Sequence, residues 1–291
     1  MPACPVKLLF PMIRLVTTSV LWLALLPGHT LFAQIASDGN ASVEKPAIHP
    51  PAKSEQERQD FKAAFATAGA NAAEIAANNF ASRYPDSELR QYLYARAMQN
   101  YELENNPAGT LAMAQKVLAV NPAHVLALVL KATILADGLQ ASDPDHAKKA
   151  DEIRKCATLA IGSVSKGFVA PAAATAQQAA VYRTTLQAMA YSAMGMMELK
   201  TGDDANAEKD LARAAVLTKI TPDPFVWYHL ALAQDHRKKY AAALNSVQQA
   251  LQLASSNPQL QRLAEIEFDR LSGLAGRGRG SLGTSGTEPP Q

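Results

Sequence analysis

The sequence predicts an all-α protein, an α-solenoid built from stacked helix–turn–helix repeats. Alanine is abundant and aromatic residues make up only 6% of the chain, a composition that favours closely packed helices over strands. From Ser54 to about Leu271, apolar residues recur at the three- and four-residue spacing of one helical face. The same residue classes also return at a period in the thirties, which indicates a repeat protein.

The composition excludes several other classes of protein. The chain has 291 residues, of which 48% are hydrophobic and 19% charged, so it has ample material for a core and is not a disordered polar chain. Its two cysteines cannot form a disulfide scaffold. A formal net charge of +2 gives no basis for a nucleic-acid partner.

Residues 1–33 have the features of a secretory signal peptide. Lys7 and Arg14 are their only charged residues, and the twelve-residue apolar run after Arg14 is shorter than a spanning helix, which needs about 20 residues. Cleavage after Ala33 would leave an exported chain, either periplasmic or secreted. The alternative is an uncleaved N-terminal anchor facing the periplasm, because short apolar segments on either side extend the run.

Two further segments lie outside the predicted body at 54–271. Residues 34–53 contain three prolines and no periodic apolar residues, so we expect a flexible linker. Residues 272–291 are rich in Gly, Ser and Arg. We expect a disordered tail there, because such a segment cannot bury enough apolar surface to offset its ordering entropy.

The C-terminal half of the body shows the repeat most clearly. Two units lie 36 residues apart, and each has a first helix with an aromatic and a small residue, then a second helix with an alanine stripe. The matching positions are Trp227, Leu230, Ala231, Ala243 and Ala250 in the later unit, and Tyr191, Gly195, Ala207 and Ala214 in the earlier unit.

The remaining units are less regular. An earlier copy begins around Tyr94 and Met98, and the opening unit is weaker. A loop is expected over 162–171, followed by one long helix over 172–200 that acts either as a hinge or as a brace. The expected units are 54–87, 88–122, 123–161, 172–222 and 223–258, with a closing helix at 259–271.

This pattern resembles the tetratricopeptide repeat (TPR), a two-helix unit of about 34 residues. The family signature has an aromatic, Leu-Gly and Tyr in the first helix, and Ala, an aromatic and Ala in the second. Here Tyr101 keeps the tyrosine place, which holds Glu198 and Gln234 in the later units. Leu211 and Val247 stand at the second-helix aromatic place. The resemblance implies an exported bacterial protein of TPR type, whose first helices line a concave, peptide-binding channel.

Close packing explains why small residues recur at fixed places. Gly195 and Ala231 are expected to let the second helix of each hairpin approach the first. Ala214 and Ala250 would do the same against the next unit, and large residues such as Trp227 would fill the space around these contacts. Because no single hairpin buries its apolar face, neighbouring hairpins must stack.

The candidate functional site is the channel lined by the first helices. Methionines among aromatics make an adaptable apolar surface that suits an extended or helical segment of a partner. The alternative is that these side chains belong to the core. The residues predicted to line the channel are Tyr92, Gln99, Lys131, Met189, Met196, Phe225, Tyr228, Leu232 and His236.

The sequence contains no motif for catalysis, and we expect no cofactor. The motifs for phosphate loops, zinc proteases and nucleophile elbows are all missing. Asp143, Asp145 and His146 form the densest potential metal cluster. The alternative is that one of these acids caps the following helix. His229 and His236 lie two helical turns apart, a spacing that favours a channel-lining or solvated role over metal binding.

The sequence therefore predicts a non-catalytic, exported scaffold that binds a protein or peptide in its channel, without nucleic acid or a small-molecule substrate. The alternative is a structural, self-associating envelope module, or an accessory subunit of an envelope assembly. Cys156 is the only cysteine left once the signal is removed. We expect it to be a small buried residue; the alternative is a disulfide between chains.

Overall fold

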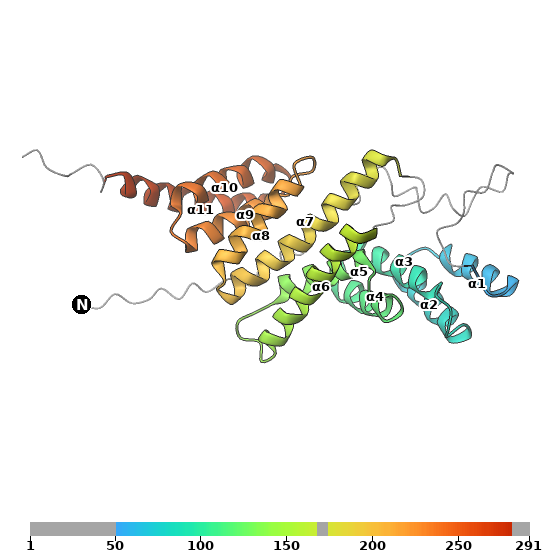
Figure 1. Ribbon diagram of the computed structural model, residues 1–291. Coiled ribbons are helices and arrows are strands. Elements are labelled where there is room, and N and C mark those ends of the chain that lie inside the picture. Colours follow the sequence, from blue (N-terminus) through green and yellow to red (C-terminus); the bar gives the residue numbers. More distant parts are fainter. Residues whose placement is uncertain (1–50, 168–173, 281–291) are drawn as a thin grey trace, which may run out of the picture.

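The computed structural model describes residues 51–167 and 174–280, and every regular element in these ranges is a helix (Figure 1). The predicted signal peptide at 1–33 lies outside the described residues, as does most of the predicted linker. The predicted all-α class is confirmed.

The helices are short and of similar length, apart from three long ones, α6, α7 and α11. The elements are α1 (Glu55–Phe65), α2 (Ala70–Arg83), α3 (Arg90–Leu103), α4 (Pro107–Val120), α5 (Val125–Gly138), α6 (His146–Gly167), α7 (Ala176–Thr201), α8 (Asp204–Leu217), α9 (Pro224–His236), α10 (Tyr240–Leu253), the 3-10 helix η3 (Ala254–Ser256) and α11 (Pro258–Gly280).

Consecutive helices pack as hairpins, from α1–α2 to α9–α10, and α11 packs against α10 at the end. Some first helices of successive hairpins also contact one another, namely α1 with α3, α5 with α7, and α7 with α9, whereas α3 and α5 show no comparable contact. Second helices show no comparable contact with one another within the described ranges. The first helices therefore lie on the inner side of the curve, and we call this side the concave face. The predicted stacked-hairpin solenoid is confirmed.

Polar residues cap the N-termini of several helices at the places where the chain turns. The side chain of Asn106 accepts a hydrogen bond from the Gly109 backbone N–H at 2.9 Å and starts α4. Asp203 and Asp223 cap α8 and α9 in the same manner. Thr175 forms a full capping box at α7. Each cap satisfies a backbone donor that has no partner inside its helix, which fixes where the helix begins.

The long helix α7 belongs to both halves of the solenoid. Its 26 residues cross between α1–α6 and α8–α11 in Figure 1. Leu186 and Ala190 are buried in the N-terminal core, whereas Ala188 packs with Ala214 of α8 and Val226 of α9. The predicted long helix is therefore continuous and packs against both parts of the solenoid.

Two predicted boundaries are wrong. The expected loop at 162–171 is helical as far as Gly167, because buried Val164 continues the apolar stripe of α6 into the N-terminal core. The expected tail from 272 is helical as far as Gly280, since α11 runs on through Leu274, one turn beyond buried Leu271. Residues 281–291 of the predicted tail lie outside the described residues.

The repeat positions form the contacts between helices. The alanines at these positions are fully buried, and so is Met98, while Tyr191 and Trp227 are half-buried where hairpins meet. The buried members are Tyr94, Met98, Gly195, Ala207, Ala214, Leu230, Ala231, Ala243 and Ala250. Gly195 shows the predicted close approach, because a Cβ atom built there would lie 2.5 Å from Cγ of Leu211 on α8.

This contact predicts that Gly195→Ala destabilises the protein. An alanine normally stabilises a helix interior by about 1 kcal/mol relative to glycine. Here the added methyl must displace fully buried Leu211, and such overpacking costs about 1–3 kcal/mol. We expect a net loss of about 1 kcal/mol or more in the free energy of unfolding, measured by urea denaturation.

Gly162→Ala is the matched control. Gly162 lies in α6, and nothing approaches within 4 Å of its added Cβ. This variant should gain stability by up to about 1 kcal/mol. A gain in both variants would contradict the close approach at Gly195.

Candidate partner-binding face

Two of the predicted channel residues are core residues instead. Phe225 is 6% exposed, because Ala254 of η3 and Leu260 at the start of α11 cover it. Met196 is 8% exposed and belongs to the N-terminal core that α7 shares with α5 and α6. The prediction that these two side chains line an open channel is wrong, and the alternative of a core role holds for both.

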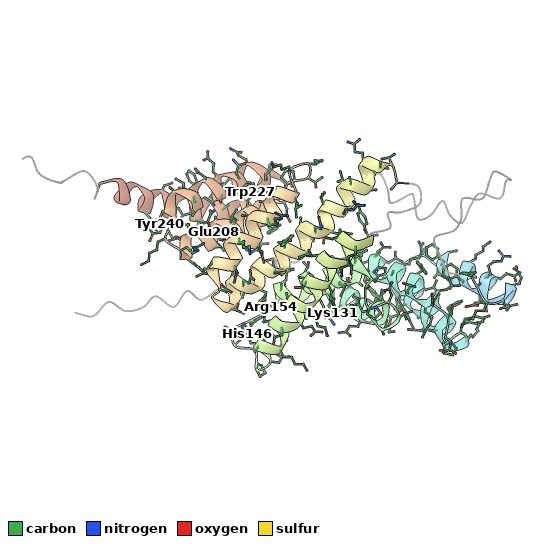
Figure 2. The ribbon with its side chains drawn as sticks, in the orientation of Figure 1. Lys131, His146, Arg154, Glu208, Trp227 and Tyr240 are labelled. Carbon is green, nitrogen blue, oxygen red and sulfur yellow. The ribbon has the colours of Figure 1, made fainter. Side chains whose placement is uncertain are left out.

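Three other predicted lining residues are held by neighbouring helices. Lys131 of α5, labelled in Figure 2, forms an ion pair with Glu152 of α6, with 2.6 Å between Nζ and Oε1. His236 Nδ1 lies 2.8 Å from Oδ1 of Asp204 on α8. Met189 is half-buried against the N-terminal core. Lys131 is therefore paired within its own hairpin, and His236 is paired with the second helix of the preceding hairpin.

The remaining four predicted residues keep part of their surface exposed on first helices. Tyr92 and Gln99 lie on α3, and Tyr228 and Leu232 lie on α9. All four side chains are half-buried. They therefore remain candidates for contact with a partner on the concave face.

Several titratable groups on first helices are strongly desolvated. Burial raises the pKa of Glu102 on α3 to about 8 and the pKa of Asp137 on α5 to about 7. On α9, burial raises the pKa of Tyr228 to about 12 and lowers the pKa of His229 to about 4. All four side chains nevertheless keep partial exposure to solvent.

Lys200 of α7 lies at the centre of this face. Its ammonium group donates hydrogen bonds to the backbone carbonyls of Ala136, at 2.6 Å, and Asp137, at 2.7 Å. A cation at the C-terminal end of α5 also complements the helix dipole. The positive charge of Lys200 lies close enough to lower the pKa of His229 further, after the larger effect of burial. Polar residues of α5, α7 and α9 therefore lie close together at one place on this face.

Three first helices each carry a buried polar atom without a partner. Nε of Arg96 on α3, Oγ1 of Thr133 on α5 and Nδ1 of His229 on α9 hydrogen-bond to none of the described residues. Each of these atoms is almost inaccessible, because the surrounding helices enclose it.

Sequence reasoning missed most of these polar residues. Arg96 and Glu102 lie three residues before and after Gln99, on the same stripe of α3. Extending the predicted lining stripe from Gln99 by three residues in each direction would have identified both Arg96 and Glu102 as candidate site residues. Thr133 and Asp137 lie four residues apart on α5 and so share one face of that helix, but the apolar stretch around them gave no sign of a face turned away from the core.

The side chains of the suspected metal cluster form other interactions in the structure. Nζ of Lys149 lies 3.0 Å from a carboxylate oxygen of both Asp143 and Asp145. His146 Nδ1 lies 2.8 Å from the backbone carbonyl of Gln140. Within 51–167 and 174–280, no three His, Cys, Asp or Glu side chains are grouped to hold a metal ion. Cys156 is buried in the N-terminal core, which raises the pKa of its thiol.

The helices that the structure describes were also compared with the length and apolarity that a membrane span requires. None of them meets both requirements.

No model of a known protein family and no curated protein sequence matches the chain. Among solved structures, the chain is similar to TTC0263, a thermophilic TPR protein in Thermus thermophilus, with 14% identity and a TM-score of 0.45 over 72% of this chain and 98% of that one. It is also similar to MamA protein, with 13% identity and a TM-score of 0.38 over 68% of this chain and 98% of that one. At these values neither likeness carries an argument about function.

Proposed function

We propose that this TPR-like solenoid is a non-catalytic, exported scaffold that binds a segment of a protein partner along its concave face. The observation that supports it most is the set of side chains on first helices that keep part of their surface exposed, namely Tyr92, Gln99, Tyr228 and Leu232. Export rests on the signal-like sequence of residues 1–33. The proposal needs no cofactor, small-molecule substrate or nucleic acid.

The chemistry of the partly exposed side chains favours a peptide as the occupant. Half-buried Tyr228 and Leu232 offer apolar surface on α9, and Tyr92 and Gln99 add polar groups on α3. An extended segment carries side chains as well as main-chain donors and acceptors, so it can contact both kinds of surface.

Site-specific crosslinking in intact cells tests the proposal. A photo-reactive amino acid would replace Gln99 or Leu232, which are half-buried on first helices, in the full chain. The matched controls are Gln115 on α4 and Gln248 on α10, which are exposed on second helices. We expect the same envelope protein to be crosslinked from both concave positions and from neither control.

The pattern of adducts decides between the hypotheses. Equal adducts from all four positions, or none from the concave pair, would refute binding at this face. Adducts of twice the mass of the chain would instead support the self-associating module. Adducts that form only in the cytosol would contradict export.

A further inference from the structure

Two buried carboxyl groups lie within the α7–α8 hairpin. Glu198 of α7 is 5% exposed and Asp210 of α8 is 8% exposed. Oε2 of Glu198 is inaccessible and has no hydrogen-bond partner among the described residues. Asp210 forms neither a side-chain hydrogen bond nor an ion pair with any described residue. Two ionised carboxylates buried without partners would be strongly destabilising.

The next hairpin shows what these two positions do elsewhere in the repeat. Gln234 of α9 and Ser246 of α10 lie 36 residues after Glu198 and Asp210, respectively, at the same places in their unit. There the Ser246 hydroxyl donates a hydrogen bond to Oε1 of Gln234 at 2.7 Å. A neutral donor and an acceptor thus join the two helices of the α9–α10 hairpin.

The α7–α8 hairpin carries two acids where α9–α10 has this donor and acceptor. Ionised carboxylates only accept hydrogen bonds, so the pair cannot form the equivalent contact while both are charged. A single proton turns one carboxyl group into a donor and leaves the other as acceptor. Like-charged carboxyl groups that share a site commonly hold a proton in this way.

We propose that Glu198 and Asp210 share one proton, which closes the α7–α8 hairpin as the Ser246–Gln234 hydrogen bond closes α9–α10, and that ionisation of both loosens it. The proton acts as a pH-dependent latch at the helix that packs against both halves of the solenoid. The two carboxyl groups bind the proton, and their protonation state controls the contact between α7 and α8.

The surrounding charges agree with a protonated pair. Burial is the main cause that raises the pKa of Glu198 to about 7, and the neighbouring Asp210 and Asp203 raise it further. Arg154 of α6, labelled in Figure 2, and Lys209 of α8 act in the opposite direction on the pKa of Glu198 and are outweighed. Burial likewise raises the pKa of Asp210.

The other helices packed on α7 have their charged groups engaged elsewhere. On α5, Lys131 pairs with Glu152, and Asp137 lies beside Lys200. On α9, Asp235 pairs with Arg270 of α11 and His236 with Asp204 of α8. His229 of α9 is neutral near pH 7, because burial lowers its pKa to about 4. The helices α5 and α9 therefore present no unpaired carboxylate or ammonium group to replace the shared proton.

The sign of the pH dependence follows from linkage. The folded protein binds this proton more tightly than the unfolded chain, in which the pKa of a glutamate is near 4.5. The stabilisation is therefore fully present below pH 4.5 and is lost as the pH rises toward the folded pKa of about 7. Above that pH the hairpin carries two buried negative charges.

The test compares wild type with the double variant Glu198→Gln/Asp210→Ser, which copies the Gln234–Ser246 pair into α7–α8. Urea unfolding of the full chain would be followed at about pH 5 and about pH 8. We expect the folded-to-unfolded ratio of wild type, relative to the variant, to fall at least about tenfold between these pH values. Glu102 and Asp137 are present in both proteins, so their contributions cancel in the comparison.

Equal pH dependence of the two proteins would overturn the proposal. If the variant does not fold, carbon-13 NMR of the Glu198 and Asp210 carboxyl groups in wild type keeps the test open. One of the two resonances should titrate near neutral pH. Ionisation of both groups by about pH 5 would overturn the shared proton. Neither the urea nor the NMR measurement depends on a partner. The shared-proton proposal can therefore fail while binding at the concave face stands, or hold while that binding fails.

Discussion

Replacing Ala250 by glutamate is expected to unfold the C-terminal half or to cost about 4 kcal/mol or more of the free energy of unfolding. Ala250 of α10 is fully buried with Ala243 and Val247, and Ala264 and Leu271 of α11 close the same cluster. A glutamate there adds volume to a packed site and buries a charge without a partner. Urea denaturation followed by circular dichroism would measure the loss.

Gln252→Glu is the matched control for this variant. Gln252 lies two residues along α10, and its side chain is exposed. Introducing the same charge there should change the free energy of unfolding by no more than about 0.5 kcal/mol. Similar losses in both variants would show that α10 does not present its alanine stripe to α11.

The second large effect is expected for Trp227→Ala. The indole lies against three apolar clusters, one shared by α10 and α11, one by α7 and α8, and one centred on Leu211. Figure 2 labels the residue among the C-terminal helices. Because Trp227 is half-buried, its loss should cost about 3 kcal/mol, the lower end of the range for a buried tryptophan. Thermal and urea denaturation would measure it.

Ile220→Ala is the control that separates the loss of packing contacts from the loss of a large apolar side chain as such. Ile220 lies between α8 and α9 and is 73% exposed. Ile220→Ala should therefore change stability by no more than about 0.5 kcal/mol. A loss below about 1 kcal/mol for Trp227→Ala would contradict its role as the contact that joins these clusters.

The regular positions of the repeat could be read from the sequence. Ala207, Ala214, Ala243 and Ala250 recur at fixed spacing, and all four are fully buried at helix contacts. Such positions are predictable because only a small side chain allows two helix backbones to approach closely. Gly195 is the strongest example, since even one methyl group would collide with Leu211.

The candidate site was predicted less well. Phe225 and Met196 have the spacing of channel residues, yet neighbouring helices cover them. Lys131 has the spacing of a lining residue as well, but Glu152 of the next helix holds its ammonium group. Spacing along a helix places a residue on one face of that helix. It does not determine which neighbour covers that face.

The sequence by itself determined the class of this protein, its hairpin repeats and the alanine contacts between them, because these depend on local periodicity and side-chain size. The tertiary structure decided which polar groups are left without partners, from His229 on the concave face to Glu198 inside a hairpin. It also decided that α7 packs against both halves. These outcomes depend on desolvation by residues distant in sequence, and the spacing within a single helix does not contain that information.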